Sequence, residues 1–191
     1  MNLSLVTGPS GYPVSEEEAR DHLRIDGNDS DLYLKGLIAC ATDIVEKITR
    51  RALLTQTWKV FFDCFPDREI QIPLAKLQSV THLKYYDSGD ILQTVSGSSY
   101  IVDSVSEPGR ITPLPYDIWP ITNFRPNAVE VQFVAGYGKA DQVPMPIRQA
   151  ILMLISHWYE NREPVAINVA VMPVPKTVDF LLSSYRVLRF F

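Results

Sequence analysis

The 191-residue chain has few of the features that mark secreted or membrane proteins. Its two cysteines, Cys40 and Cys64, lie among apolar neighbours and lack CxxC spacing, which favours buried thiols in a reducing compartment. The start, residues 1–5, lacks the basic region and long apolar run of a signal peptide. No apolar run reaches membrane-spanning length. We therefore expect a soluble protein that is made in the cytoplasm and does not contact a membrane.

Motifs of catalysis and metal binding are also missing. No HExxH or paired Cys/His spacing involves the three histidines, which fall in different expected elements: His22, His82 and His157. Residues 136–139 (Gly-Tyr-Gly-Lys) resemble a phosphate loop only superficially, because that motif requires glycine in place of Phe133 and Ser or Thr in place of Ala140. No GxSxG nucleophile elbow is present. We expect no catalytic activity, no cofactor and no bound metal.

One acidic run, residues 26–31 (Asp-Gly-Asn-Asp-Ser-Asp), invites comparison with a calcium loop. The glycine required at the sixth position of such a loop is Asp31, and the bidentate glutamate required at the twelfth is Leu37. A turn that caps the following helix is the favoured interpretation.

Basic charge is scarce over most of the chain, whose net charge is −4. Residues 1–53 carry 6 basic and 9 acidic groups, and residues 54–143 carry 7 and 10. Residues 144–191 are mildly basic, with 5 and 3. The acidic majority argues against binding nucleic acid by phosphate neutralisation. The charge difference is a weak indication that the end of the chain meets a different surface from the rest.

The strongest pattern present is an apolar helix between Pro144 and Pro164. Its apolar side chains recur at helical spacing and cover most of the circumference, which predicts a central, covered helix. Pro146 suits a first helical turn, and the residue before Pro164 is pushed out of the α region. We expect the stretch from Ile147 to Ile155 to be core.

Three further helices are expected around this one. Ser15 and Glu18 form a capping box that opens a short helix ending near residue 25. Apolar residues at helical spacing predict a second helix over about 31–50 and a final short helix over about 176–185. None of these segments could bury its apolar stripe alone, so we expect a small bundle of about four helices.

Between the helices the period changes to that of short strands. β-Branched and aromatic runs separated by turn residues predict strands at 57–62, 69–72, 80–86, 91–95, 100–102 and 128–134. Short links make the sheet mostly antiparallel. Residues 113–126, rich in proline around Trp119, are too apolar to be a flexible linker. The predicted fold is α+β: a discontinuous helical bundle (1–53 with 144–191) and an inserted β domain (54–143).

The ordered set of these segments resembles the head–tail connector (adaptor) proteins of long-tailed bacteriophages, in the branch with a β insertion in a helical bundle. Leu83-Lys84-Tyr85-Tyr86-Asp87 and Phe133-Val134-Ala135-Gly136-Tyr137-Gly138 are typical pieces. The other stretches that carry the resemblance are 14–25, 45–53, 100–103, 108–111, 146–150, 158–163 and 181–186. No single piece is specific, but their order and separations are.

The resemblance implies a structural virion protein of the neck, at the head–tail interface. Such adaptors form a ring, commonly of twelve subunits, beneath the portal protein, and a neck/stopper or tail-completion protein binds next. The genome DNA passes through the channel without sequence-specific binding, which an acidic body suits. A closed ring needs two different contact faces on each subunit.

Two surfaces are hypothesised for these contacts. The docking tail, residues 186–191 with the preceding Tyr185, would bind the portal through apolar anchors and arginines: Tyr185, Arg186, Leu188, Arg189, Phe190 and Phe191. The alternative is that the tail packs on its own helices. A subunit contact is expected where the apolar stripe becomes aromatic and charged: Trp158, Tyr159, Arg162 and Glu163. The competing function is a non-viral binding module that uses Trp58 and Trp119 of the β domain.

Overall fold

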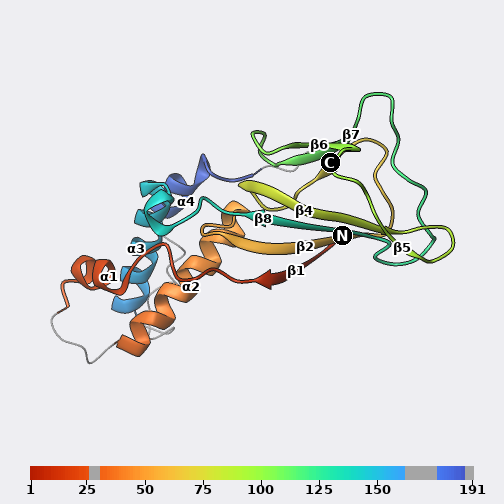
Figure 1. Cartoon of the computed structure of the whole chain (residues 1–191). Helices are drawn as coiled ribbons and strands as arrows, with labels where there is room; N and C mark the ends of the chain where they lie inside the picture. The colour runs from red at the N-terminus through yellow and green to blue at the C-terminus, as the bar shows by residue number, and fades with distance from the viewer. Residues whose placement is uncertain (26–30, 162–175, 188–191) are drawn as a thin grey trace. The chain divides into compact units, whose positions relative to one another are not determined.

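The computed structural model describes residues 1–25, 31–161 and 176–187, and the chain divides into two compact units (Figure 1). The helical unit comprises Ser10–Leu54 and Gly138–Arg186. The β unit comprises Met1–Pro9, Thr55–Tyr137 and the chain end from Val187. Every described helix lies in the first unit and every described strand in the second. The predicted α+β class, with four α-helices and antiparallel sheets, is confirmed.

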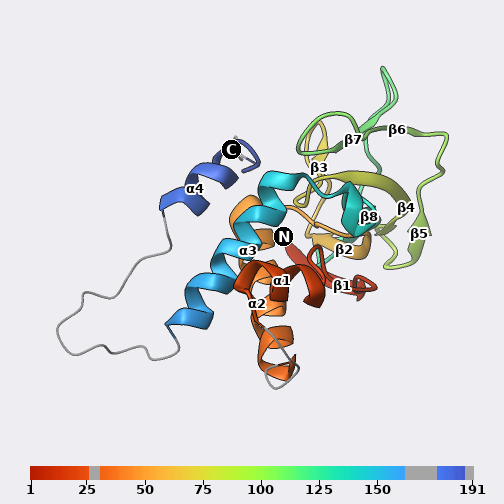
Figure 2. The same cartoon turned by 90° about the vertical axis from the view of Figure 1, so that its left-hand side faces the viewer.

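The helical unit is built around α3 (Met145–Glu160), which packs against α1 (Glu16–Leu23), α2 (Asp31–Thr49) and α4 (Lys176–Ser183) (Figure 2). The inward side chains of α3 are fully buried: Ile147, Ala150, Ile151, Leu154 and Ile155. A short 3-10 turn, Ala140–Gln142, precedes α3. Burial on three sides is what the nearly continuous apolar circumference requires, so the predicted central core helix is confirmed.

The first helix begins at the capping box that the sequence predicts. Ser15 Oγ accepts a hydrogen bond from the Glu18 amide at 3.1 Å, and the Ser15 amide donates to Glu18 Oε2 at 2.9 Å. Val14 and Ala19 are buried beside this turn, where a hydrophobic residue before the cap fixes the entry of the chain. The other carboxylate oxygen of Glu18 pairs with Arg148 of α3 and joins α1 to the central helix.

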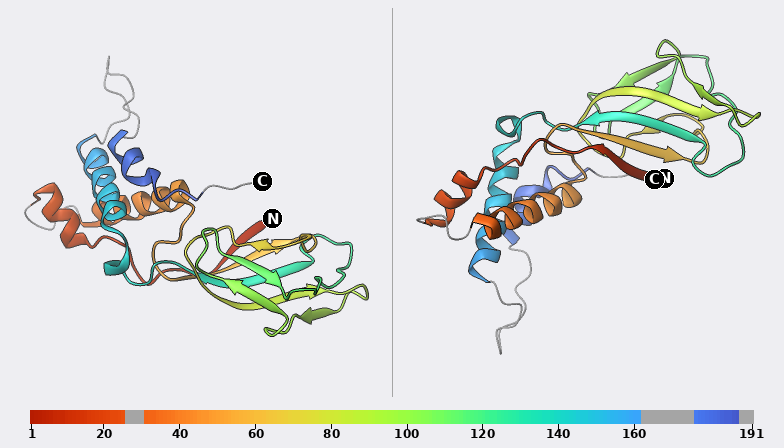
Figure 3. Two further views of the ribbon diagram at one scale, coloured as in Figure 1. Left: turned by 90° about the horizontal axis from the view of Figure 1, so that it is seen from above. Right: turned by 60° about the horizontal axis from the view of Figure 1, so that its bottom comes forward.

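The β unit consists of two antiparallel sheets, and the smaller one covers one face of the larger (Figure 3). The five-stranded sheet has the order β1-β2-β8-β4-β5, with β1 (Asn2–Thr7), β2 (Gln56–Phe62), β8 (Val129–Ala135), β4 (Leu77–Tyr86) and β5 (Leu92–Thr94). The three-stranded sheet has the order β3-β7-β6, with β3 (Ile70–Gln71), β7 (Arg110–Pro113) and β6 (Tyr100–Asp103).

The core of the β unit lies between the sheets. Cross-strand register aligns Val60, Val131 and Leu83 on neighbouring strands, and all three are fully buried. Phe133 lies on the same inner face, while Ile111 faces it from the smaller sheet, and both are also buried. The alternation of buried and half-buried positions along β8 is the pattern of a central strand with one covered face.

The structure corrects three expectations. Strands β1 and β7 were not predicted, because β1 buries neither face and β7 ends at Pro113, a residue that weakens a strand pattern. Residues 1–9, expected with the helices, belong to the β unit because β1 pairs with β2. The cysteines are exposed, not buried: Cys40 lies on the side of α2 opposite the buried Ile38, and Cys64 follows the end of β2.

Other predictions fall outside the described residues. These include the acidic run up to residue 30, the conformation of 165–175, and the side chains at 162, 163 and 188–191. Among the helices that the structure describes, none combines the length and apolar character needed to cross a bilayer.

Candidate functional site

The start of the predicted docking tail is held within the helical unit. Tyr185 is half-buried, and its carbonyl oxygen accepts a hydrogen bond from Nε of the buried Arg51 at 2.6 Å. Arg186 is exposed and its Nη2 pairs with Asp179 Oδ1 of α4 at 2.8 Å. Leu188, Arg189, Phe190 and Phe191 lie outside the described residues. The portal-binding role of the set stays a hypothesis, and the described residues fix only where the tail begins.

The aromatic end of α3 packs against α2. The Tyr33 hydroxyl donates to the Trp158 carbonyl at 3.4 Å, and the Tyr33 and Tyr159 rings lie 6.1 Å apart at 44°. Trp158 and Tyr159 are half-buried, so part of each side chain is available for another contact. The other two members of the expected subunit contact, Arg162 and Glu163, lie outside the described residues.

The two tryptophans expected to serve a binding module make contacts within the β unit. Trp58 is half-buried and its Nε1 donates to Gln56 Oε1 at 3.0 Å. Trp119 is only 9% exposed, and its Nε1 donates to the Arg68 carbonyl at 2.9 Å. Both indole N–H donors are therefore already paired within the β unit, so only the ring surfaces of these side chains are left for contact with a ligand or partner.

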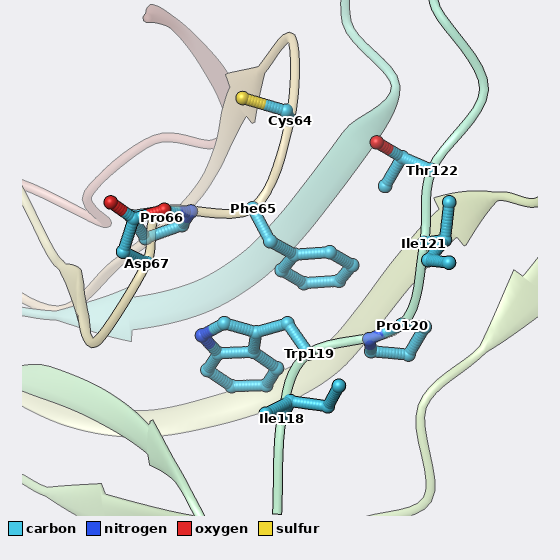
Figure 4. A pocket seen from close by; sticks show the side chains of 9 residues that line it. All are labelled: Cys64, Phe65, Pro66, Asp67, Ile118, Trp119, Pro120, Ile121 and Thr122. Atoms are coloured by element: carbon cyan, nitrogen blue, oxygen red, sulfur yellow. The ribbon is translucent and has the colours of Figure 1, made fainter.

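Trp119 instead forms the floor of an open pocket between the loop after β2 and the 113–126 segment (Figure 4). Its ring stacks on Phe65 with 5.0 Å between centroids and 7° between planes. The pocket has a volume of about 320 Å³ and is lined by Cys64, Phe65, Pro66, Asp67, Ile118, Trp119, Pro120, Ile121 and Thr122. Asp67 is the one charged residue in this lining.

The far end of the 113–126 segment is tied to the β4–β5 hairpin. The Arg125 guanidinium lies 3.9 Å from the Tyr86 ring centroid, and its Nη1 pairs with Asp90 Oδ1 at 2.8 Å. Asn123 donates its amide to the Tyr86 carbonyl at 2.9 Å and its side-chain Nδ2 to Asp90 Oδ1 at 3.2 Å. The hydrogen bonds from Arg125 and Asn123 hold the pKa of Asp90 below its usual value.

Four large side chains of the same segment point into solvent. Tyr116 and Phe124 are fully exposed, and Ile118 and Ile121 are 88% and 82% exposed. Exposed apolar side chains gathered on one fixed segment are typical of a protein–protein contact. Sequence reasoning recognised an ordered apolar segment here, but it named only Trp119 as a binding residue, for the competing binding-module function. The available signal was the alternation of prolines with large apolar residues between two strands.

Two charge clusters lie elsewhere on the β unit. Glu130 Oε1 contacts Lys59 Nζ at 2.9 Å and His82 Nε2 at 2.8 Å. Burial acts to raise the pKa of Glu130, but the hydrogen bonds from His82 and Lys59 outweigh it, and the net pKa is lowered. In the second cluster, hydrogen bonds from Ser106 and Arg110 hold the pKa of Asp103 far below its usual value.

Both clusters are satisfied pairs that join neighbouring strands. Arg110 of β7, for example, pairs with Asp103 of β6 at 2.9 Å and with Glu69 at 3.2 Å. Within the described ranges no group of three His, Cys, Asp or Glu side chains has the geometry of a metal site. The clusters therefore serve the sheets, whereas large apolar side chains of the 113–126 segment remain exposed.

Comparison with known proteins gives a consistent result over the whole chain. No family model and no curated protein matches the sequence. Among solved structures, a chain in the neck of an empty GTA particle, computed with C6 symmetry, matches with a TM-score of 0.83 and 24% identity. A chain in the virion of the native gene transfer agent (GTA) particle matches with 0.81 and 25%. A chain in the neck of the native GTA particle, computed with C12 symmetry, matches with 0.79 and 26%.

Each likeness covers 100% of this chain and 98% of the other. The match therefore includes both the helical unit and the β unit, in the same order along the sequence. The neighbours are components of GTA particles, and two of them belong to necks computed with C6 and C12 symmetry. The resemblance read from the sequence is confirmed at this level: over its full length the chain has the fold of structural proteins of the virion neck.

Proposed function

We propose that the chain is the adaptor of the neck: a ring beneath the portal protein that extends the DNA channel and joins the head to the next neck or tail component. The observation that carries the proposal is the full-length likeness to chains in necks with C6 and C12 symmetry. A ring of twelve subunits agrees with the C12 symmetry of one of these necks. A cyclic ring places two different faces of each subunit in contact.

The portal-binding element in this proposal is the docking tail with Tyr185. Arg186 is held by Asp179 and Val187 is buried, so we place the main anchors from position 188 onward. Leu188, Phe190 and Phe191 supply apolar anchors and Arg189 a charged partner, which is the composition of an interface hot spot. A short tail that leaves a folded unit can be removed without disturbing the core.

The test removes residues 188–191 and measures how much of the chain remains on DNA-filled heads, by quantitative mass spectrometry and electron microscopy. We expect the melting temperature of the purified variant to stay unchanged and its occupancy on heads to fall at least tenfold. A matched control is Phe180→Ser, since Phe180 is an exposed aromatic on α4 outside the tail. Normal occupancy of the truncated chain would exclude the tail as the portal-binding element.

The ring contact is proposed at the end of α3, with Trp158 and Tyr159 as apolar contacts and Arg162 and Glu163 as charged ones. Tyr33 contacts the Tyr159 ring and the Trp158 carbonyl, and both Trp158 and Tyr159 remain only half-buried. The variant Arg162→Glu should reduce ring assembly on portals, and the further change Glu163→Arg should restore part of it if the two residues pair across subunits. Native mass spectrometry of portal complexes would show this, and unaffected rings in Arg162→Glu would contradict the proposed contact.

A further inference from the structure

We infer that the next protein of the neck docks on the apex surface, defined as the Phe65–Trp119 pocket together with Tyr116, Ile118, Ile121 and Phe124. The partner would contribute an extended segment with an apolar anchor beside a basic residue. The inference rests on the proposed adaptor function and gives it a site and a partner chemistry. The contact proposed above between subunits of the ring, at the end of α3, does not include these residues.

The apex surface is held rigidly from beneath. Trp119 is fixed by its stacking on Phe65 and by its hydrogen bond to the Arg68 carbonyl. Beyond the pocket, Arg125 bridges Tyr86 and Asp90. These contacts fix both sides of the exposed stretch 116–124, so a partner does not have to order it on binding. Such preorganisation lowers the entropic cost of association.

The side chains of the apex surface that face solvent are large and apolar, which is unusual for a segment without a binding partner. Ile118 and Ile121 flank Trp119 on either side in the sequence, and both line the pocket and face solvent (Figure 4). A fixed backbone with anchors inside and aliphatic or aromatic side chains outside is how binding surfaces are positioned on rigid scaffolds. The pocket volume, about 320 Å³, is large enough for one side chain of a partner, and the exposed Ile118 and Ile121 give an apolar anchor its contacts.

The negative charge of the apex surface favours a partner segment with a basic residue. Asp67 lines the pocket and Asp117 lies between Tyr116 and Ile118. In the described part of the chain, neither carboxylate has an ion pair or hydrogen bond, whereas the nearby Asp87 and Asp90 are both engaged. Two unpaired carboxylates beside apolar side chains complement a basic residue next to an apolar anchor.

A second copy of this chain fits the apex surface less well. Residues 55–137 of the β unit carry 6 basic and 9 acidic groups, so the β unit of a neighbour would bring further acidic charge toward Asp67 and Asp117. Like charges brought together at a contact act against association. The inference therefore names a different neck protein, with a cationic and apolar docking segment, as the occupant.

The test uses virions assembled with the full chain carrying Ile118→Asp and Ile121→Asp. Both side chains are more than four-fifths exposed, so the double variant should keep the melting temperature of the wild type. Val105→Asp is the matched control, because Val105 is an equally exposed aliphatic residue of the β unit outside the apex surface. Two quantities are measured by mass spectrometry and electron microscopy: the amount of the chain on filled heads, and the amount of the next neck protein and tail attached.

We expect the apex double variant to occupy heads normally while the next neck protein and tail fall at least tenfold, with the Val105→Asp control unaffected. A second variant, Asp67→Lys with Asp117→Lys, should give a smaller loss of the same kind, because the apolar anchor remains. Tails attached at wild-type levels on the apex double variant would overturn the inference. Loss of that folded variant from heads would also overturn it, and would assign the surface to attachment to the head or to a contact between copies. Absence of the wild-type chain from heads would instead refute the adaptor function itself.

Discussion

At the residue scale, Glu18 joins local and tertiary structure. One carboxylate oxygen accepts from the Ser15 amide and completes the capping box, and the other pairs with Arg148. The Arg148 side chain is 17% exposed, and its Nε is buried without a hydrogen-bond partner among the described residues. The charge of Arg148 therefore depends on Glu18 for much of its compensation. The start of α1 and its attachment to α3 rest on one side chain.

Replacing Glu18 by alanine should lower the free energy of unfolding by about 1–3 kcal/mol, because the variant loses a cap contact and leaves a largely buried cation unpaired. The free energy of unfolding of Glu18→Gln should lie between those of the wild type and Glu18→Ala. The glutamine side chain can still accept the hydrogen bond from the Ser15 amide, but it carries no charge to pair with Arg148. Urea denaturation followed by circular dichroism measures the difference. Glu17→Ala is the control, because Glu17 is exposed in the same helical turn. Equal effects of the two alanine variants would contradict this role of Glu18.

Asp90 makes the attachment of the apex surface sensitive to acid. Its pKa is lowered from 3.8 by hydrogen bonds from Arg125 and Asn123. A lowered pKa means that the contact stabilises the folded state above the usual pKa and is lost as the pH falls through the lowered value. The Trp119 indole N–H resonance should therefore stay constant from pH 7 to about pH 5 and shift only below about pH 4. In Asp90→Asn this acid step should be absent, and a shift of similar size near pH 6 in the wild type would contradict the assignment.

At the element scale, the helices could be predicted because each carries its own signal. The α3 stripe, its flanking prolines and the Ser15–Glu18 box are local features, and local features survive folding unchanged. The burial of the inward residues between Ile147 and Ile155 follows from their helical spacing. The exposed cysteines show the limit of that reasoning, because neighbours in the sequence do not decide which side of a helix faces water.

Strand β1 could not be predicted, because its residues are all exposed and only its pairing with β2 makes it a strand. Leu3 and Leu5 lie opposite Val60 and Trp58 in the register, so they extend the inner face of the sheet without being covered. The alternation of polar and apolar residues from Asn2 to Leu5 is too short to identify a strand without its partner. Its role is to occupy the edge of β2.

Removing residues 1–8 should therefore expose a new edge on the five-stranded sheet. We expect the free energy of unfolding to fall by about 1–3 kcal/mol, because the β2 backbone loses its partners on one side. We also expect concentration-dependent self-association, since β2 would present an unpaired edge with apolar side chains. Thermal unfolding and light scattering test both effects, with Leu3→Thr as a control that keeps the backbone of β1. A truncated chain that is monomeric and as stable as the full chain would contradict the edge-covering role.

At the scale of the whole molecule, both units are discontinuous in the sequence. The helical unit joins Ser10–Leu54 to Gly138–Arg186, and the β unit joins the N-terminal strand to Thr55–Tyr137. The sequence predicts the bracketing of strands by helices, because that alternation is visible along the chain. It does not predict the apex surface, because the pocket joins residues 64–67 to residues 118–122. Which of the apolar residues in 113–126 turn outward is decided by contacts with Phe65 and Tyr86 that no local pattern contains.

Charge over the whole molecule predicts how the proposed channel treats DNA. The net charge is −4, and many of the cations are already paired with carboxylates, among them Lys59, Arg110, Arg125 and Arg148. Cations paired in this way release few counterions on meeting phosphates, so binding should be weak and only slightly dependent on salt. Fluorescence anisotropy with a short DNA duplex at about 150 mM salt should give a Kd weaker than about 10⁻⁴ M, the weak end of non-specific binding. Micromolar binding that falls steeply with salt would contradict a surface past which DNA slides freely.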